Sequence, residues 1–181
     1  MDYLLSSFLP KADVPAFGRV KNVLLVDASV VCRDGKKQEQ QRIHMCCSLN
    51  RNRMYEVKVT DKHTAESLSH FSIKKDDLVI ADAGYGTAHN DIHAQGQQAD
   101  VILRITPKCF CLYGTDGNKI SLVQLLKEAE KRQEKMTEVF VFCKYGKDTA
   151  FVRVIAGKMP EGQAEKSRQR KKRQLQENSI R

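Results

Sequence analysis

The sequence predicts an α/β protein with a mixed sheet and flanking helices. Residues 21–106 show the order strand, hairpin, short helix, strand, helix, strand, which is typical of a mixed sheet covered by helices. Two apolar runs in this segment end in the same way, each in an aspartate. The length of 181 residues suffices for one domain with a sizeable core and is short for two ordinary domains.

The first strands follow from short apolar runs. Residues 23–27 are apolar and β-branched and predict a strand, whereas the polar segment 32–41 predicts a loop. Residues 42–49 and 54–60 predict a hairpin around the turn 50–53. In the second strand of this hairpin apolar and charged residues alternate, so we expect one buried face and one face in water.

The next segments alternate between helix and strand. Residues 62–71 predict a short helix with Thr64 as its N-cap. The run 76–82 shows little alternation and predicts an interior strand covered on both faces. A short helix over 86–95 and a strand over 99–106 complete the first sheet.

The second half of the chain changes in character. Its turn-rich start is followed by an amphipathic helix over 121–135 and a hairpin around the turn 144–148. Residues 163–176 contain no glycine or proline and predict a basic helix. The chain therefore divides into an N-terminal lead-in (1–20), a core (21–106), a β-rich insertion (107–160) and a basic helical tail (161–181).

The charge balance favours a polyanionic partner. The net charge is +9 and the pI is near 9.3, which makes nucleic acid the first candidate and an acidic membrane surface the second. Six cations stand close together in the tail: Lys166, Arg168, Arg170, Lys171, Lys172 and Arg173. A solvated tail is the alternative explanation of this run. No apolar run approaches the ~18 residues of a membrane span, and the N-terminus lacks the basic leader of a signal peptide.

Cysteine and histidine residues give weaker indications. The six cysteines form no Cys-x-x-Cys pair and no zinc-ribbon spacing, which favours reduced structural thiols in a cytosolic protein. His89 and His93 stand four residues apart, a spacing that could hold a metal on one helix face. No further ligand has a matching spacing, so we expect a polar helix surface there.

Two aspartates are the strongest candidates for chemistry. Asp27 ends the apolar run of "VLLVDAS", and Asp82 ends that of "LVIADAGYG". If the two strands are neighbours, the carboxylates meet at one sheet edge, which is unfavourable unless a cation lies between them. Mg²⁺ (or Mn²⁺) takes carboxylate oxygens, and a pair of such ions ~4 Å apart serves phosphodiester chemistry. The alternative is that each aspartate caps the turn after its strand.

Several blocks resemble, in the same order, the catalytic domain of bacterial DDE transposases of the insertion-sequence-four type. "LLVDAS" resembles the block around the first catalytic aspartate, and "DDLVIADAGYG" resembles the second, usually Asp-x-Gly-Tyr-Gly. "RIHMCCSLNRNRMYEVKVTDKHTAESL", "ADVILRIT" and "FVRVIAGKMPEGQAEKSRQRKKR" resemble further segments. The similarity covers roughly residues 20–175.

The resemblance implies a ribonuclease-H-like fold and metal-dependent DNA cleavage and strand transfer in cut-and-paste transposition. It assigns Asp27 and Asp82 as the first two metal ligands. The turn after the second acid would be shaped by Gly84, Tyr85 and Gly86. Arg104 and the six tail cations become candidate DNA contacts, although a plain surface arginine is an equal explanation of Arg104. The implied partner is double-stranded DNA in the bacterial cytoplasm, at the nucleoid. A homodimer in the DNA complex is compatible with this, and no membrane is involved.

One element of the family pattern is missing. The third acid, a glutamate in a Tyr-x2-Arg-x3-Glu-x6-Lys motif, has no counterpart before Arg181, and Glu161, Glu165 and Glu177 lack that setting. We therefore expect a catalytically incomplete fragment. Two other functions stay open: a non-catalytic DNA-binding remnant or regulator, and a metal-dependent nuclease. Glu66 lies in a matching block but receives no chemical role.

Overall fold

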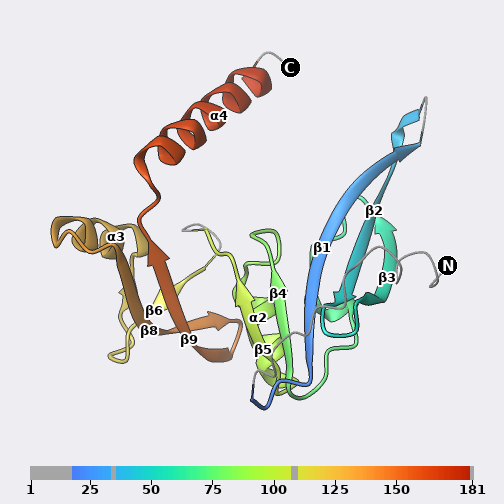
Figure 1. Ribbon diagram of the computed structural model, residues 1–181, viewed down its shortest axis with the longest axis horizontal. Helices are drawn as coiled ribbons and strands as arrows, with labels where there is room; N and C mark the ends of the chain where they lie inside the picture. Colours follow the sequence, from blue (N-terminus) through green and yellow to red (C-terminus); the bar gives the residue numbers. More distant parts are fainter. Residues whose placement is uncertain (1–17, 34–35, 107–109, 180–181) are drawn as a thin grey trace.

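The protein is a mixed α/β structure with two sheets, as the sequence predicts at this level (Figure 1). The computed structural model describes residues 18–33, 36–106 and 110–179; residues 1–17 of the N-terminal lead-in and Cys109 lie outside these ranges. A five-stranded sheet has the order β3-β2-β1-β4-β5. Its strands are β1 (Asn22–Arg33), β2 (Lys36–Ser48), β3 (Arg53–Asp61), β4 (Asp77–Ala81) and β5 (Asp100–Leu103).

The second sheet has four strands in the order β7-β6-β8-β9. They are β6 (Leu112–Tyr113), β7 (Lys119–Ile120), β8 (Met136–Tyr145) and β9 (Asp148–Gly157). The described helices are the 3-10 turn η1 (Leu68–His70), α2 (Ala88–Gly96), α3 (Leu122–Lys131) and α4 (Glu161–Ser179). None of the helices in the described part of the chain is both long and apolar enough to cross a membrane.

The five-stranded sheet combines two kinds of pairing. Strand β2 is antiparallel to both of its neighbours, β1 and β3, which confirms the predicted β2–β3 hairpin. Strand β4 runs parallel to β1, and β5 runs parallel to β4. Parallel neighbours need a crossover connection, and α2 supplies it between β4 and β5.

Helix α2 lies between the two sheets and contributes to both cores. On one side Ala94 packs with Leu24, Val79 and Tyr85 in the core of the five-stranded sheet. On the other side Ala88 belongs to the core that covers the second sheet. The helix begins after Thr87, whose side chain accepts a hydrogen bond from Asn90 N. The five-stranded sheet therefore has one packed face, and the second sheet lies beyond its helix.

The opposite face of the five-stranded sheet is more open than predicted. Along β4, Val79 is fully buried, but Ile80 on the other face is only half-buried. Its neighbours on this face, Leu25 and Ile102, are 38% and 56% exposed. The expectation that the run 76–82 is covered on both faces is therefore wrong in the described structure; the low alternation reflects apolar residues on an open face.

Strand β1 is longer than the sequence suggested. It continues through Val30 and Val31 to Arg33, and most of the polar segment 32–41 forms β2 instead of a loop. β-branched residues favour extended backbone, and the two strands pair with each other beyond the part of the sheet that β3 and β4 reach. Asp27 consequently lies inside β1 and not at its end.

The predicted helix over 62–71 is also wrong. Only the 3-10 turn η1 forms, and its N-cap is Ser67 instead of Thr64. The side chain of Asn90 accepts a hydrogen bond from Leu68 N at 2.8 Å, a donor that the helix would have bonded to the backbone oxygen of Thr64. Such side-chain bonds compete with helix formation.

Candidate metal and DNA site

Asp27 and Asp82 directly follow the last register pair of two neighbouring strands. That pair is Val26 of β1 with Ala81 of β4; Asp27 is the next residue of β1, and Asp82 is the first residue after β4. The pairing of β1 with β4 meets the condition under which the two acids were expected to meet at one sheet edge, since neighbouring strands are about 4.8 Å apart. β4 ends at this point while β1 continues, which leaves both acids exposed.

The turn after β4 fixes the carboxylate of Asp82. Its Oδ1 accepts a hydrogen bond from Gly84 N at 2.9 Å, and its Oδ2 pairs with Arg104 at 3.2 Å. This hydrogen bond is the turn-capping role that was the alternative for Asp82. A Cβ at Gly86 would clash with the backbone oxygen of Arg104, so only glycine allows the two segments to approach this closely. Arg104, which is predicted to contact DNA, thus forms an ion pair with Asp82 in this structure.

Glu66 is the acid whose position the sequence did not reveal. It pairs with Arg42 at 3.1 Å, and both side chains are about one-fifth exposed (22% and 21%). Burial raises the pKa of Glu66, Arg42 acts to lower that pKa, and the charges of Asp82 and Asp27 raise it again. The three carboxylates therefore lie in one electrostatic neighbourhood. A glutamate in a loop between β3 and η1 carries no sequence signal that would place it here.

Glu66 packs directly against the glycine of the Asp82 turn. A Cβ at Gly84 would overlap the Glu66 carboxylate.

We expect Gly84→Ala to displace either Glu66 or the turn, and so to weaken Mn²⁺ binding at Asp82 several-fold. The double variant Gly84→Ala with Glu66→Ala should recover part of that affinity because it removes the overlap. Isothermal titration with Mn²⁺ measures both effects. Gly96→Ala, where nothing lies within 4 Å, is the control, and equal affinities for Gly84→Ala and Gly96→Ala would contradict this packing.

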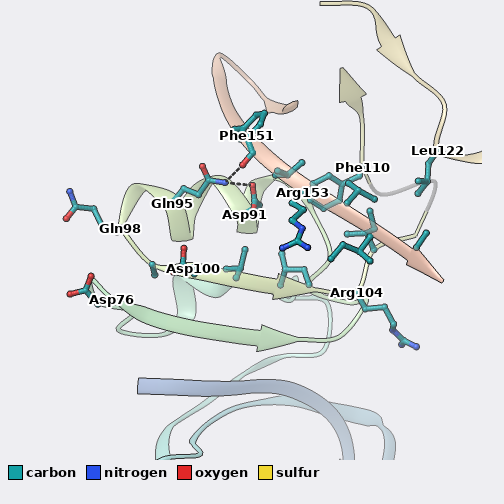
Figure 2. Close-up of a pocket in the computed structure, with 18 of the residues that line it drawn as sticks. Asp76, Asp91, Gln95, Gln98, Asp100, Arg104, Phe110, Leu122, Phe151 and Arg153 are labelled. Carbon is teal, nitrogen blue, oxygen red and sulfur yellow. Dashed lines mark hydrogen bonds between the residues drawn. The ribbon is translucent and has the colours of Figure 1, made fainter. Parts of the chain in front are cut away.

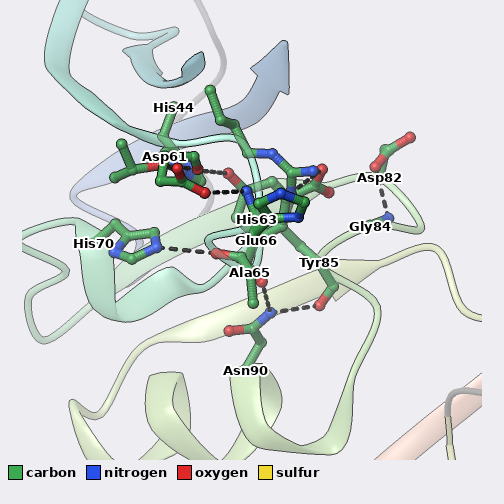
Figure 3. Close-up of polar contacts among 12 residues, drawn as sticks. His44, Asp61, His63, Ala65, Glu66, His70, Asp82, Gly84, Tyr85 and Asn90 are labelled. Carbon is green, nitrogen blue, oxygen red and sulfur yellow. Dashed lines mark hydrogen bonds and ion pairs between the residues drawn. The ribbon is translucent and has the colours of Figure 1, made fainter. Parts of the chain in front are cut away.

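A buried polar network supports the turn from below (Figure 3). Asn90, fully buried on α2, donates to the backbone oxygens of Tyr85 at 2.9 Å and Glu66 at 3.2 Å. The hydroxyl of Tyr85 is hydrogen-bonded to His44 Nδ1 at 3.2 Å, and His44 Nε2 is hydrogen-bonded to Thr60 Oγ1 at 2.9 Å. Burial, followed by the charges of Glu66 and Asp27, raises the pKa of Tyr85. Tyr85 is therefore a structural residue of the turn.

The buried His44 makes stability depend on pH. Burial lowers its pKa, and the nearby His70, Arg42 and Lys58 add to this shift. As pH falls below about 6.5, the unfolded chain therefore takes up a proton that the folded state does not, and stability is lost. We expect this site to reduce the free energy of unfolding by up to about 1.4 kcal/mol per pH unit in that range.

Urea unfolding at pH 7.5, 6.5 and 5.5 measures this dependence. His44→Asn should flatten it, whereas His63→Asn at an exposed position should leave it unchanged. Burial also lowers the pKa of His93, so part of the slope should remain in the His44 variant. An unchanged slope in His44→Asn would show that His44 does not titrate as stated.

The basic tail forms helix α4, which projects away from both sheets (Figure 1). Five of its predicted DNA-binding residues are exposed: Lys166, Arg168, Arg170, Lys172 and Arg173. The side chain of Lys171 lies outside the described part. These residues lie within positions 166–173, about 10 Å of helix. Their spacing places Lys166, Arg170 and Arg173 on one side of α4 and Arg168 and Lys172 on the other.

The other candidate metal positions are not brought together. His89 and His93 lie on α2 with ring centroids 6.5 Å apart. Within residues 18–33, 36–106 and 110–179, no group of three or more His, Cys, Asp or Glu side chains is arranged to hold a metal ion. Cys32, Cys46, Cys47, Cys111 and Cys143 are free thiols. A metal at Asp27 and Asp82 would therefore have two protein ligands and fill its shell with water, as Mg²⁺ commonly does.

Comparison with known proteins assigns no family. No family model matches the chain, and neither a curated protein nor a solved structure shows significant similarity to it.

Proposed function

We propose that this chain carries the first two metal-binding acids of a DNA strand-transfer site on a ribonuclease-H-like core, as in the DDE transposases that it resembles. The observation that supports the proposal is the parallel pairing of β1 with β4, whose last register pair, Val26 with Ala81, directly precedes the two aspartates. A central mixed sheet with α2 on one face supports this fold assignment. The chain would act on DNA in the bacterial cytoplasm, at the nucleoid.

The residues at the site suit a hard divalent cation. Two adjacent, exposed carboxylates repel each other, and Mg²⁺ or Mn²⁺ would relieve that repulsion with the oxygen ligands it prefers. Bound there, the ion would supply Lewis acidity to a phosphodiester. Asp27 and Asp82 would hold it, and Gly84 N would orient the Asp82 carboxylate. Arg104, whose side chain is 72% exposed, could leave Asp82 and pair with a phosphate.

No third carboxylate of the described residues is grouped with Asp27 and Asp82 to hold a metal ion. Glu66 lies nearby but is paired with Arg42. We therefore expect little or no strand transfer by this chain alone. Incubation with Mn²⁺ and labelled duplex distinguishes a nuclease from an incomplete transposase site. Cleavage of plain duplex would favour a metal-dependent nuclease. Metal binding without turnover would favour an incomplete transposase site.

The second candidate function, a non-catalytic DNA-binding remnant or regulator, rests on α4. Its exposed cations should bind duplex through phosphates and release counterions. We expect log-log plots of affinity against salt to have a slope of about −4 to −5, corresponding to four to six contacts at ~0.9 each. Fluorescence anisotropy with a random duplex measures this slope.

Two variants that each remove five positive charges show where on the protein DNA binds. Glutamine at Lys166, Arg168, Arg170, Lys172 and Arg173 should abolish most of the affinity and the slope. The same number of glutamines at exposed lysines elsewhere should have a small effect; these are Lys119, Lys127, Lys131, Lys135 and Lys147. Equal losses in both variants would show that net charge, not α4, determines DNA binding.

A further inference from the structure

A cavity of about 960 Å³ lies between the two sheets, away from the paired aspartates (Figure 2). One wall is formed by α2 and the free edge strand β5, and the other by β9, the edge strand of the second sheet. The apolar part of its lining includes Phe110, Leu122, Val154 and Ala156. A space of this size is within the range of small-molecule sites.

Asp91 is the unusual residue of this cavity. It lies in the first turn of α2 and is only 5% exposed. Its Oδ2 accepts a hydrogen bond from Gln95 Nε2 at 3.0 Å and a weak one from Cys143 Sγ at 3.5 Å. Gln95 Nε2 also donates to the backbone oxygen of Phe151 at 3.1 Å. No cation pairs with Asp91 in the described part of the chain.

The other two acids of the cavity are paired with cations: Asp76 with Lys21 and Asp100 with Arg19, both at 2.8 Å. Besides Arg19, the lining contains Arg104 and Arg153, which pair with acids outside it: Arg104 with Asp82, and Arg153 with Glu138 at 2.7 Å. The fourth cation of the lining, Lys75, acts on Asp76. Asp91 is thus the acid of the lining left without a counterion. Buried carboxylates are normally paired.

We propose that this cavity binds a small organic cation, a guanidinium or ammonium group on an apolar stem, with the charged group at Asp91. The stem would lie against Phe110, Leu122 and Val154. A charge-assisted hydrogen bond in a place with little water is strong, and the ligand would supply the missing counterion. Burial raises the pKa of Asp91. This is the direction expected for a buried carboxyl group that has no cationic partner. This proposal does not depend on the transposase assignment.

Hexylguanidinium chloride is a suitable probe, and hexylurea is its uncharged match in shape. Isothermal titration at pH 7.5 should show saturable binding of hexylguanidinium, with hexylurea at least about tenfold weaker. Asp91→Asn should lose at least about tenfold in affinity for hexylguanidinium and not for hexylurea. Asp100→Asn, at the paired aspartate of the same cavity, should stay within about threefold of the wild type.

Amide chemical shifts of the wild-type chain provide a second measurement that needs no variant. Titration with hexylguanidinium should move the amides of Asp91, Gln95 and Val154 along one binding curve. Equal affinity for the two probes, unchanged affinity in Asp91→Asn, or shifts confined to other regions would each overturn the proposal, as would the absence of binding.

Discussion

Substituting asparagine for Asp27 or Asp82 should lower the Mn²⁺ affinity of the chain by at least about tenfold. Loss of even an outer-shell partner commonly costs 10- to 100-fold in metal affinity, and each of these aspartates would be a direct ligand. Both substitutions preserve side-chain shape, and both positions are exposed, so the fold should be retained. Both variants should show the loss, because the aspartates directly follow the last register pair of two neighbouring strands.

The signal of free Mn²⁺ in electron paramagnetic resonance measures this loss directly. Asp148→Asn, at an exposed acid at the start of β9, is the matched control and should bind Mn²⁺ as the wild type does. Wild-type affinity in both Asp27→Asn and Asp82→Asn would remove the basis of the proposed metal site. A loss in only one of them would show that the aspartates do not share an ion.

Replacing Asn90 by alanine should destabilise the protein by about 2–4 kcal/mol. The side chain is fully buried and serves three backbone groups: it accepts from Leu68 N and donates to the oxygens of Glu66 and Tyr85. Its removal leaves these groups buried without partners, which costs more than the net value of the hydrogen bonds. Chemical unfolding followed by circular dichroism measures the change.

The same substitution should also affect the site. Asn90 connects the Glu66 segment to the turn that carries Asp82, so Mn²⁺ affinity should fall while the protein is still folded. Gln97→Ala, at an exposed position just past α2, should change neither stability nor affinity. A destabilisation of Asn90→Ala below about 0.5 kcal/mol, the usual size of surface effects, would show that water replaces these bonds.

Sequence patterns predicted the elements that have a local signal. The β2–β3 hairpin, β4, α2, the β8–β9 hairpin and α4 follow from alternation, apolar runs, turn residues or the absence of glycine and proline. The pairing of β1 with β4 was a condition of the sequence argument, and the structure meets it. These features depend on short-range order, which a single sequence records.

The predictions failed where contacts between residues far apart in the sequence determine the local structure. The segment 62–71 has helical composition, but the side chain of Asn90, more than twenty residues away in sequence, accepts the hydrogen bond of Leu68 N. The position of Glu66 against Gly84 likewise depends on the packing of one loop on another. Asp91 and the inter-sheet cavity arise from the way α2 lies between two sheets, which no local pattern encodes.

The location of α2 between the sheets also couples their folding. One side of the helix, at Ala94, completes the core of the five-stranded sheet, and the other side, at Ala88, belongs to the core of the second sheet. Neither sheet can lose this helix without exposing apolar surface on the other. We therefore expect the two sheets to lose their structure together when the protein unfolds.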